Sequence, residues 1–189
     1  MAFVPVFVDA EGARIVVVGA GPVGTRKALE WREAGADVHV VAPRATDELQ
    51  ASARAGRIVY RAKFFEPTDL DGAFFVVAAT SDTAVQDEVA RAARARGLFV
   101  NAVDDPTRAS AHAAATIRRG PYTVAIHSGG EAPALTRLIR EVLESALPSD
   151  EWIRRARALR RQWRAAGTPF DARFPELVRA FVEAAGGGS

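Results

Sequence analysis

The chain has 189 residues, of which 49% are hydrophobic and 25% are charged, with a formal net charge of +2. This composition is ordinary for a globular domain, and no apolar run approaches the roughly eighteen residues needed to cross a membrane. The first residues lack a basic region and a cleavage site, so we expect a cytoplasmic protein without an export signal. The absence of cysteine excludes disulfides, thiolate metal sites and cysteine nucleophiles.

Strand and helix patterns alternate over the first hundred residues. Strands are predicted at 14–18, 38–42, 58–61, 74–79 and 98–103, and helices at 24–34, 47–55 and 82–96. Residues 3–8 are a candidate for a further edge strand, where Pro5 would be tolerated. The alternation favours an α/β fold in which a doubly wound parallel sheet carries helices on both faces.

The pattern changes after about residue 108. An apolar strand at 122–126 precedes helices at 133–146, 152–166 and 174–185. These pieces are too few for an independent core, which suggests a dimerisation module that a second subunit completes. We therefore predict a dinucleotide-binding domain at 1–108, a dimerisation region at 109–148 and a helical C-terminal domain at 149–189.

The most informative motif follows the first predicted strand, where Gly19-Ala20-Gly21-Pro22-Val23-Gly24 has the spacing G-x-G-x-x-G. In a dinucleotide-binding turn, the first glycine permits the tight turn and the second lets the backbone approach a pyrophosphate. The third allows close packing of helix on strand. Pro22 suits a first helical turn, whose amides bind phosphate. Because a strand and a helix frame the motif, we predict a nicotinamide dinucleotide site, although such glycines also occur for purely steric reasons.

The choice between NAD and NADP stays open. No carboxylate stands at the tip of the second predicted strand, which ends Ala42-Pro43-Arg44, while Asp47 and Glu48 come later, inside the next helix. Arg44 would suit a 2′-phosphate, or it is an exposed loop residue. Pro43 is predicted to line the cofactor site.

Ligands in open α/β sheets bind beyond the carboxyl ends of the strands. Thr80 and Asn101 are predicted there as cofactor-binding residues, and Asp104 as the catalytic group that takes or gives a proton. The alternative for Asp104 is a simple turn, because Asp-Asp-Pro is good turn chemistry by itself.

A second Gly-containing turn, Ser128-Gly129-Gly130, opens the predicted helix at 133–146. Its amides could hold an anion, but locally we favour Ser128 as an ordinary helix N-cap. His39 lies within a predicted strand and is interpreted as structural, whereas His112 and His127 flank the second module and could reach a pocket. The three histidines lack metal-ligand spacing, so no metal site is predicted.

Arginine dominates the basic residues, numbering 23 against two lysines, and six arginines between 154 and 164 meet no acidic residue. This run favours either a polyanionic ligand or a solvated helix face. Because no aromatic residues are interleaved in the manner that stacks bases, we expect no nucleic-acid partner.

Together these stretches resemble precorrin-2 dehydrogenase, including bifunctional members that are also sirohydrochlorin ferrochelatases, the N-terminal part of sirohaem synthase. The resemblance covers about residues 3–148. It rests on the order and spacing of five elements, which are Pro5-Val6-Phe7, the glycine motif continued by Thr25-Arg26-Lys27-Ala28, Ala78-Ala79-Thr80-Ser81-Asp82, Asn101-Ala102-Val103-Asp104, and Ser128-Gly129-Gly130 before Pro133-Ala134-Leu135.

The resemblance implies a homodimer with a Rossmann domain, interlocked protomers and a small helical tail. It implies oxidation of precorrin-2 to sirohydrochlorin by NAD⁺, with ferrous iron as a second substrate where chelation occurs. Asp104 aligns with the family aspartate implicated in catalysis. Ser128 and Gly129 align with the turn beside the tetrapyrrole pocket, to which we add His112. The substrate carries eight carboxylates, which suits a chain rich in arginine.

The sequence also departs from the family. Residues 110–116 lack the usual Phe-x-x-Pro element, a histidine stands in this segment, and Asp105 adds a second carboxylate beside Asp104. The methyltransferase domain to which some members are fused is absent from the chain. Two alternatives therefore stay open, a non-catalytic sensor that binds NAD(H) or a tetrapyrrole, and an enzyme that only inserts metal.

Overall fold

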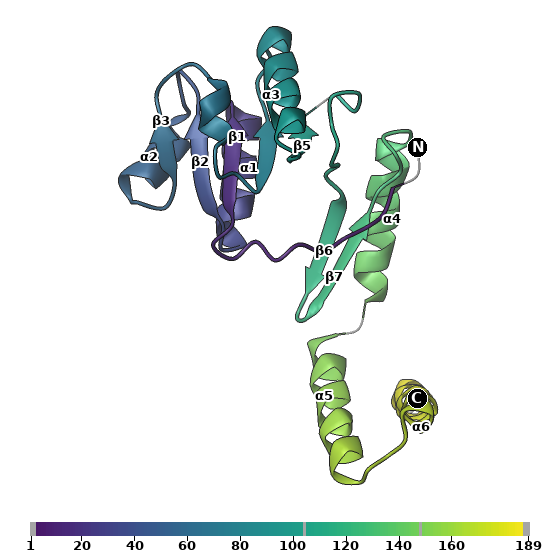
Figure 1. Cartoon of the computed structure of the whole chain (residues 1–189). Coiled ribbons are helices and arrows are strands. Elements are labelled where there is room, and N and C mark those ends of the chain that lie inside the picture. Colours follow the sequence, from purple (N-terminus) through teal and green to yellow (C-terminus); the bar gives the residue numbers. More distant parts are fainter. Residues whose placement is uncertain (1–2, 104, 148, 187–189) are drawn as a thin grey trace. The chain divides into compact units, whose positions relative to one another are not determined.

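The computed structural model describes residues 3–103, 105–147 and 149–186 (Figure 1). The chain separates into two compact units, with residues up to 114 in the first and residues from 115 in the second. Each unit is described by itself. The predicted further division at 148/149 stays a prediction.

The first unit is built on a five-stranded parallel sheet with the strand order β3-β2-β1-β4-β5. Its strands are β1 (Arg14–Val18), β2 (Asp37–Val41), β3 (Val59–Arg61), β4 (Phe75–Ala78) and β5 (Phe99–Ala102). Its helices are α1 (Pro22–Glu33), α2 (Asp47–Arg54), the short 3-10 helix η1 (Pro67–Leu70) and α3 (Thr83–Ala95). The order reverses between β1 and β4, and such a switch point is where open α/β sheets bind ligands.

Both faces of the sheet are buried, which is why its strands read as continuous apolar runs. Ile15 and Val17 of β1 pack on one face in a cluster with residues of α1 and α2. Val16 and Val18 point to the other face, in a cluster with residues of η1 and α3. The predicted Rossmann-type doubly wound fold is confirmed, with each of its predicted strands and helices within a few residues of its observed position.

The predicted edge strand at residues 3–8 is wrong, because this segment forms no strand. Both neighbours of β1 are already occupied, and the outer edge of β5 is engaged by its own continuation. There Ser110 and Ala111 donate backbone hydrogen bonds to the Val100 carbonyl at 2.8 and 3.0 Å. Pro5 also has no N–H to donate. Residues 3–8 instead leave Val4, Val6 and Phe7 more than 70% exposed.

A buried carboxylate fixes the connection between β3 and β4. The Asp69 side chain is 2% exposed and lies 3.2 Å from Arg61 and 3.1 Å from Lys63. It also accepts a 2.9 Å hydrogen bond from the Glu66 backbone N–H. Hydrogen bonds to Glu66 and Asp69 hold the pKa of the Lys63 ammonium above its ordinary value.

The second unit contains an antiparallel hairpin and three helices. They are β6 (Ala115–Arg119), β7 (Tyr122–Ile126), α4 (Pro133–Ala146), α5 (Asp150–Ala165) and α6 (Phe170–Gly186). Among its described residues only Ile117 and Ile153 are buried hydrophobics. A Cβ placed on Gly120, in the hairpin turn, would stand 3.0 Å from Ile153 Cδ1, so the first turn of α5 packs against the hairpin. Trp152 of α5 contacts Phe181 of α6, with 4.3 Å between ring centroids.

Within the described part of the chain, no helix combines the length and apolarity that crossing a membrane requires.

Candidate functional site

Two glycines of the G-x-G-x-x-G motif are required by close packing at the switch point. Gly19 follows β1 with φ +103°, and a Cβ there would stand 2.4 Å from the Ala79 carbonyl oxygen beyond β4. A Cβ on Gly24 would stand 2.1 Å from the Gly19 carbonyl oxygen. Both distances are far inside van der Waals contact, so the turn and the helix–strand packing exclude any larger residue.

Gly21 has a different role, because a Cβ there would meet no protein atom within 4 Å. It is the N-cap of α1, with φ −70° and ψ −174°, a conformation that any residue adopts. No side chain caps α1 within the described residues, whereas Thr46 caps α2 and Asp82 caps α3. The space beside Gly21 is thus open at the start of α1, where Pro22 has no N–H and the first-turn donors begin at the Val23 amide, and this cradle fits a dinucleotide pyrophosphate.

Backbone hydrogen bonds continue past the strand ends and align the loops along the carboxyl edge of the sheet. The Gly19 N–H donates to Val41 O at 2.9 Å, and the Ala79 N–H donates to Val18 O at 2.8 Å. The Val103 N–H donates to Ala78 O at 2.9 Å. Ala20, Thr80 and the residues after β5 therefore emerge from this edge of the sheet.

Sequence reasoning missed a threonine pair that supports the glycine turn. Buried Thr25 of α1 lies 2.7 Å from Thr46, measured between the hydroxyl oxygens. The Thr46 N–H also donates to Ala20 O at 3.1 Å, while its hydroxyl accepts from the Leu49 N–H at 3.3 Å. The signal was available, because Thr46 directly precedes the acidic first turn of α2, as N-caps do.

The loop after β2 holds the residues that bear on the choice of nucleotide. Pro43 and Arg44 are exposed, and Arg44 is the first charged residue after the strand. Asp47 and Glu48 lie in the first turn of α2, as predicted, and not at the strand tip.

Thr80 and the start of α3 form a hydrogen-bonded turn. The Thr80 hydroxyl accepts from the Asp82 N–H at 3.2 Å, and its carbonyl accepts from the Gln86 side-chain amide. The Asp82 carboxylate accepts from the Ala84 and Val85 amides at 2.9 and 3.2 Å, which occupies the N-terminus of α3. Of the amino ends of α1 and α3, only that of α1 is open to a ligand.

The segment after β5 doubles back along the strand. Asn101 donates its side-chain amide to the Ala111 carbonyl at 3.0 Å, and the Val100 N–H donates to the Ser110 hydroxyl at 2.9 Å. Asn101 therefore shapes this edge and is half-buried there. Asp104, the predicted catalytic residue, lies outside the described residues.

Asp105 is engaged in its own turn. It accepts hydrogen bonds from the Thr107 N–H at 2.9 Å and from the Arg108 guanidinium. Arg108 also lies 2.6 Å from Asp87 of α3, and this hydrogen bond lowers the pKa of the Asp87 carboxyl and raises that of Arg108. The second carboxylate seen in the sequence thus anchors the loop to α3.

The predicted substrate residues belong to both units. His112 is half-buried in the first unit, with its ring 4.7 Å from that of Phe3 in an edge-on contact. Gly129, with φ +70°, and Ser128 belong to the second unit. The interpretation of Ser128 as an N-cap is wrong, because α4 starts at Pro133 with Ala132 as its N-cap. The Ser128 hydroxyl accepts from the Ala132 N–H at 3.3 Å and so closes the turn before the helix.

The remaining titratable groups of the described residues form no cluster of metal ligands. His39 lies in β2 as predicted, with Nε2 3.0 Å from Asp37 Oδ2. Among the described residues, no three His, Asp or Glu side chains cluster as metal ligands would.

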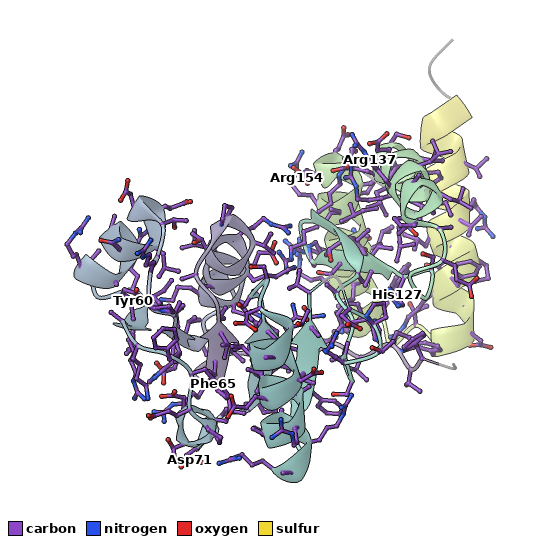
Figure 2. All side chains as sticks on the ribbon, turned by 90° about the horizontal axis from the view of Figure 1, so that it is seen from above. Tyr60, Phe65, Asp71, His127, Arg137 and Arg154 are labelled. Atoms are coloured by element: carbon purple, nitrogen blue, oxygen red, sulfur yellow. The ribbon has the colours of Figure 1, made fainter. Side chains whose placement is uncertain are left out.

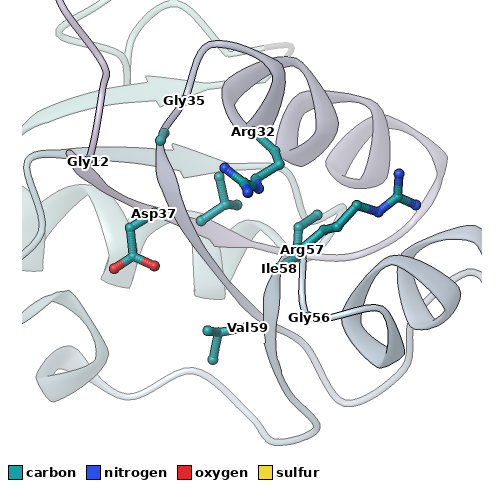
Figure 3. A pocket seen from close by; sticks show the side chains of 10 residues that line it. Gly12, Arg32, Gly35, Asp37, Gly56, Arg57, Ile58 and Val59 are labelled. Atoms are coloured by element: carbon teal, nitrogen blue, oxygen red, sulfur yellow. The ribbon is translucent and has the colours of Figure 1, made fainter.

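A cavity of about 240 Å³ lies at the opposite, amino-terminal edge of the sheet (Figure 3). It is lined by residues at the starts of β2 and β3, including Asp37 and Val59, and by Arg32 at the end of α1. Since the glycine turn follows the carboxyl end of β1, this cavity is separate from the nucleotide cradle.

Comparison with known protein families supports nucleotide binding by the first unit. Residues 6–115 match the model of a family described as "Putative NAD(P)-binding". The chain belongs to this NAD(P)-binding family. The match spans the sheet, the glycine turn and the loops at its carboxyl edge.

Curated relatives extend the likeness beyond the nucleotide-binding unit. The chain is 44% identical over 149 residues to siroheme synthase of Photorhabdus laumondii and 42% identical over 149 residues to siroheme synthase 1 of Pectobacterium atrosepticum. Each alignment covers 79% of this chain, but the chain spans only about a third of these relatives, 32% and 31%. The resemblance to sirohaem synthase stated from the sequence is confirmed.

One solved structure matches nearly the whole chain. It is SirC, a precorrin-2 dehydrogenase, with a TM-score of 0.76 and 25% sequence identity. The match covers 94% of this chain and 88% of that protein, so it includes elements of both units.

Proposed function

We propose that this protein oxidises precorrin-2 to sirohydrochlorin with NAD⁺. One observation carries the proposal: the structural match to a precorrin-2 dehydrogenase covers 94% of this chain and so extends beyond the nucleotide-binding unit. A likeness confined to that unit would support dinucleotide binding alone, because one fold hosts many activities.

The chain's part in holding the cofactor follows from the cradle. The first-turn amides of α1 bind the pyrophosphate at the open face of Gly21, and Pro43, Thr80 and Asn101 border the rest of the nucleotide. When bound, NAD⁺ supplies the hydride acceptor. We propose NAD⁺ over NADP⁺ from the family resemblance, with exposed Arg44 as the residue that would favour the phosphorylated form.

The reaction removes a hydride and a proton from precorrin-2 and yields sirohydrochlorin, NADH and H⁺. A base is needed for the proton, and we assign this role to Asp104, which directly follows Val103 at the carboxyl edge. Asp105 is unsuited to it, because Arg108 and Thr107 already bind its carboxylate. Ser128, Gly129 and His112 are assigned to the tetrapyrrole.

We further propose a homodimer, in which a second copy covers the apolar face of α4. Four residues with helical spacing form this face, and they are strongly exposed: Leu135 53%, Leu138 55%, Ile139 39% and Val142 57%. The half-buried positions of α4 are instead Thr136, Arg140 and Glu144. Contiguous exposed apolar surface of this kind is typical of an interface between subunits.

The dimer is tested by exchanging one residue on that face. Leu138→Glu should shift the mass measured by light scattering from dimer to monomer, because a carboxylate would be buried without a partner. Arg137→Gln is the matched control, since Arg137 is 80% exposed on the charged side of α4, paired with Glu141. A wild-type chain that is monomeric at high concentration would contradict the proposal.

The function is tested by anaerobic incubation of the purified protein with precorrin-2 and each nicotinamide. The expected result with NAD⁺ is NADH absorbance together with the sirohydrochlorin spectrum, and a lower kcat/KM with NADP⁺. A parallel arm with ferrous iron separates dehydrogenation from metal insertion. Failure to turn over while NADH still binds would favour a binding sensor, and iron insertion without need of NAD⁺ would favour an enzyme that only inserts metal.

A further inference from the structure

One face of α5 carries a cluster of arginines that the proposed reaction does not use. We define this arginine face as Arg154, Arg157, Arg160, Arg161 and Arg164. At 100° per residue these positions fall within about 120° of the helix circumference and extend over about 15 Å of its axis. All five side chains belong to exposed residues, and Arg154 can be located in Figure 2.

The arginine face differs from the basic residues of α4 and from two basic residues of α1, all of which have acidic partners. On α1, Arg26 and Lys27 both pair with Glu30. On α4, Arg137 pairs with Glu141 and Arg140 with Glu144. Within the described part of the chain, by contrast, none of the ion pairs involves the arginine face.

This arrangement works against the isolated helix. Arg157 lies three or four positions from Arg154, Arg160 and Arg161, and Arg164 has the same spacing from Arg160 and Arg161. Like charges at these spacings repel and destabilise a helix. The repulsion disappears when a polyanion lies across the face, so an anionic ligand would stabilise α5.

Packing within the second unit leaves the face open. The opposite side of α5 carries Trp152, Leu159 and Trp163, and it packs toward α6 through the Trp152–Phe181 ring contact. A hydrogen bond from the Trp163 indole N–H to Glu176 of α6 reinforces this side. Ile153 lies four positions before Arg157, on the arginine side of the first turn, and packs against the hairpin at Gly120. The five arginines nevertheless belong to exposed residues. The arginines are therefore held in a fixed helical array and point away from α6.

We propose that the arginine face is a docking surface for the polycarboxylate tetrapyrrole, made of residues other than those assigned to hydride transfer. This inference rests on the proposed function, because precorrin-2 carries eight carboxylates around its macrocycle. Guanidinium groups bind carboxylates through two parallel hydrogen bonds and also stack on planar π systems. Five guanidiniums without an ion pair among the described residues thus match the multiple carboxylates of the ligand.

Charge distribution argues against a nucleic acid as the occupant. The first unit contains thirteen basic and fifteen acidic residues, and the second contains twelve basic and eight acidic residues. The formal net charge is thus −2 for the first unit and +4 for the second, so the basic excess is confined to the second unit. The face also presents no aromatic residue between its arginines, since Trp152 and Trp163 lie on the other side of α5.

The experiment measures binding of uroporphyrin, a porphyrin octacarboxylate, to the full chain by fluorescence titration. The double variant Arg157→Gln/Arg161→Gln removes two charges from the face. The control Arg155→Gln/Arg179→Gln removes two charges from the same unit, with Arg155 lying over the Trp152 ring at 5.2 Å, off the face. We expect the dissociation constant to rise about tenfold in the first variant and less than twofold in the control.

Steady-state kinetics with precorrin-2 give an independent readout. We expect kcat/KM to fall about tenfold in the face variant, with kcat and the dissociation constant for NADH unchanged. The docking proposal would be overturned if both variants bound uroporphyrin equally well. It would also be overturned if a 24-base-pair DNA duplex bound more tightly than uroporphyrin and required these arginines. In either case, turnover by the wild-type protein would still support the proposed function. Absence of wild-type turnover would overturn the proposed function and leave the porphyrin titration to decide the face.

Discussion

Replacing Gly21 with alanine separates nucleotide binding from folding. The added methyl would meet no protein atom within 4 Å, and the backbone there, φ −70° and ψ −174°, is one that alanine adopts without strain. The methyl would, however, occupy the space through which the pyrophosphate approaches the first turn of α1. We therefore expect Gly21→Ala to fold normally and to bind NADH poorly.

The magnitudes follow from this geometry. Alanine is a poorer N-cap than glycine by up to about 1 kcal/mol, partly offset by the lower entropy of its unfolded chain, so stability changes by less than about 1 kcal/mol. Losing one charge-assisted hydrogen bond to the pyrophosphate costs about 1.5–3 kcal/mol, which raises the dissociation constant about 10- to 150-fold. Gly24→Ala is the contrasting variant, because its Cβ would lie 2.1 Å from the Gly19 carbonyl oxygen and should destabilise the fold.

The assay pairs urea unfolding with titration of NADH fluorescence for both variants. A Gly21→Ala protein with wild-type stability and wild-type affinity for NADH would refute the assignment of the cradle. Loss of stability in Gly21→Ala comparable to that in Gly24→Ala would refute the distinction between an open and a packed glycine.

Three further outcomes are expected. Asp69→Asn should lower the free energy of unfolding by about 2 kcal/mol, since it weakens hydrogen bonds to two cations, as urea titration would show. Arg108→Gln should lower the free energy of unfolding at neutral pH, and its difference from wild type should shrink below about pH 4. The folded-state pKa of Asp87 is depressed, so the stability that the Asp87–Arg108 pair contributes is lost only as pH falls. A difference in unfolding free energy that stays constant down to about pH 2 would exclude this linkage. Asp104→Asn should abolish precorrin-2 oxidation and keep NADH affinity, and undiminished turnover would remove this carboxylate from the mechanism.

The first unit was predictable because its signals are local and strong. The apolar run of β1 and the glycine turn after it specify a buried strand and a tight connection, and the observed β1 has the predicted bounds. The sequence could predict that Gly19 is required by a tight turn, but not that Ala79 is the residue it packs against. The two residues are distant in sequence and meet because β1 and β4 are neighbours.

The second unit was harder because most of its surface is exposed in the isolated chain. β6 was not predicted as a strand, since its polar sequence, Ala115–Arg119, buries only Ile117. The last helix begins at Phe170 and not at 174, and Pro175 lies inside it near its start. The bounds of such elements depend on contacts with neighbouring elements, which the local sequence pattern does not reveal. The exposed apolar face of α4 is a further sign that contacts outside the isolated chain matter for this unit.

Among the candidate site residues, the sequence could locate the glycine turn but not its supports. The Thr25–Thr46 pair joins two elements 21 positions apart, and Arg108 binds Asp87 across the same distance. Both contacts depend on how the loops at the sheet edge bring residues from different elements together, which the local sequence pattern does not reveal. The roles of Asn101, Thr80 and Ser128 toward ligands stay predictions.

The most direct test of the account is a turnover in deuterium oxide, with NADH and sirohydrochlorin quantified together. Hydride transfer from precorrin-2 to NAD⁺ predicts one NADH for each sirohydrochlorin and no solvent deuterium at the nicotinamide C4, by mass spectrometry. Sirohydrochlorin formed without NADH, or NADH carrying deuterium from the solvent, would contradict it.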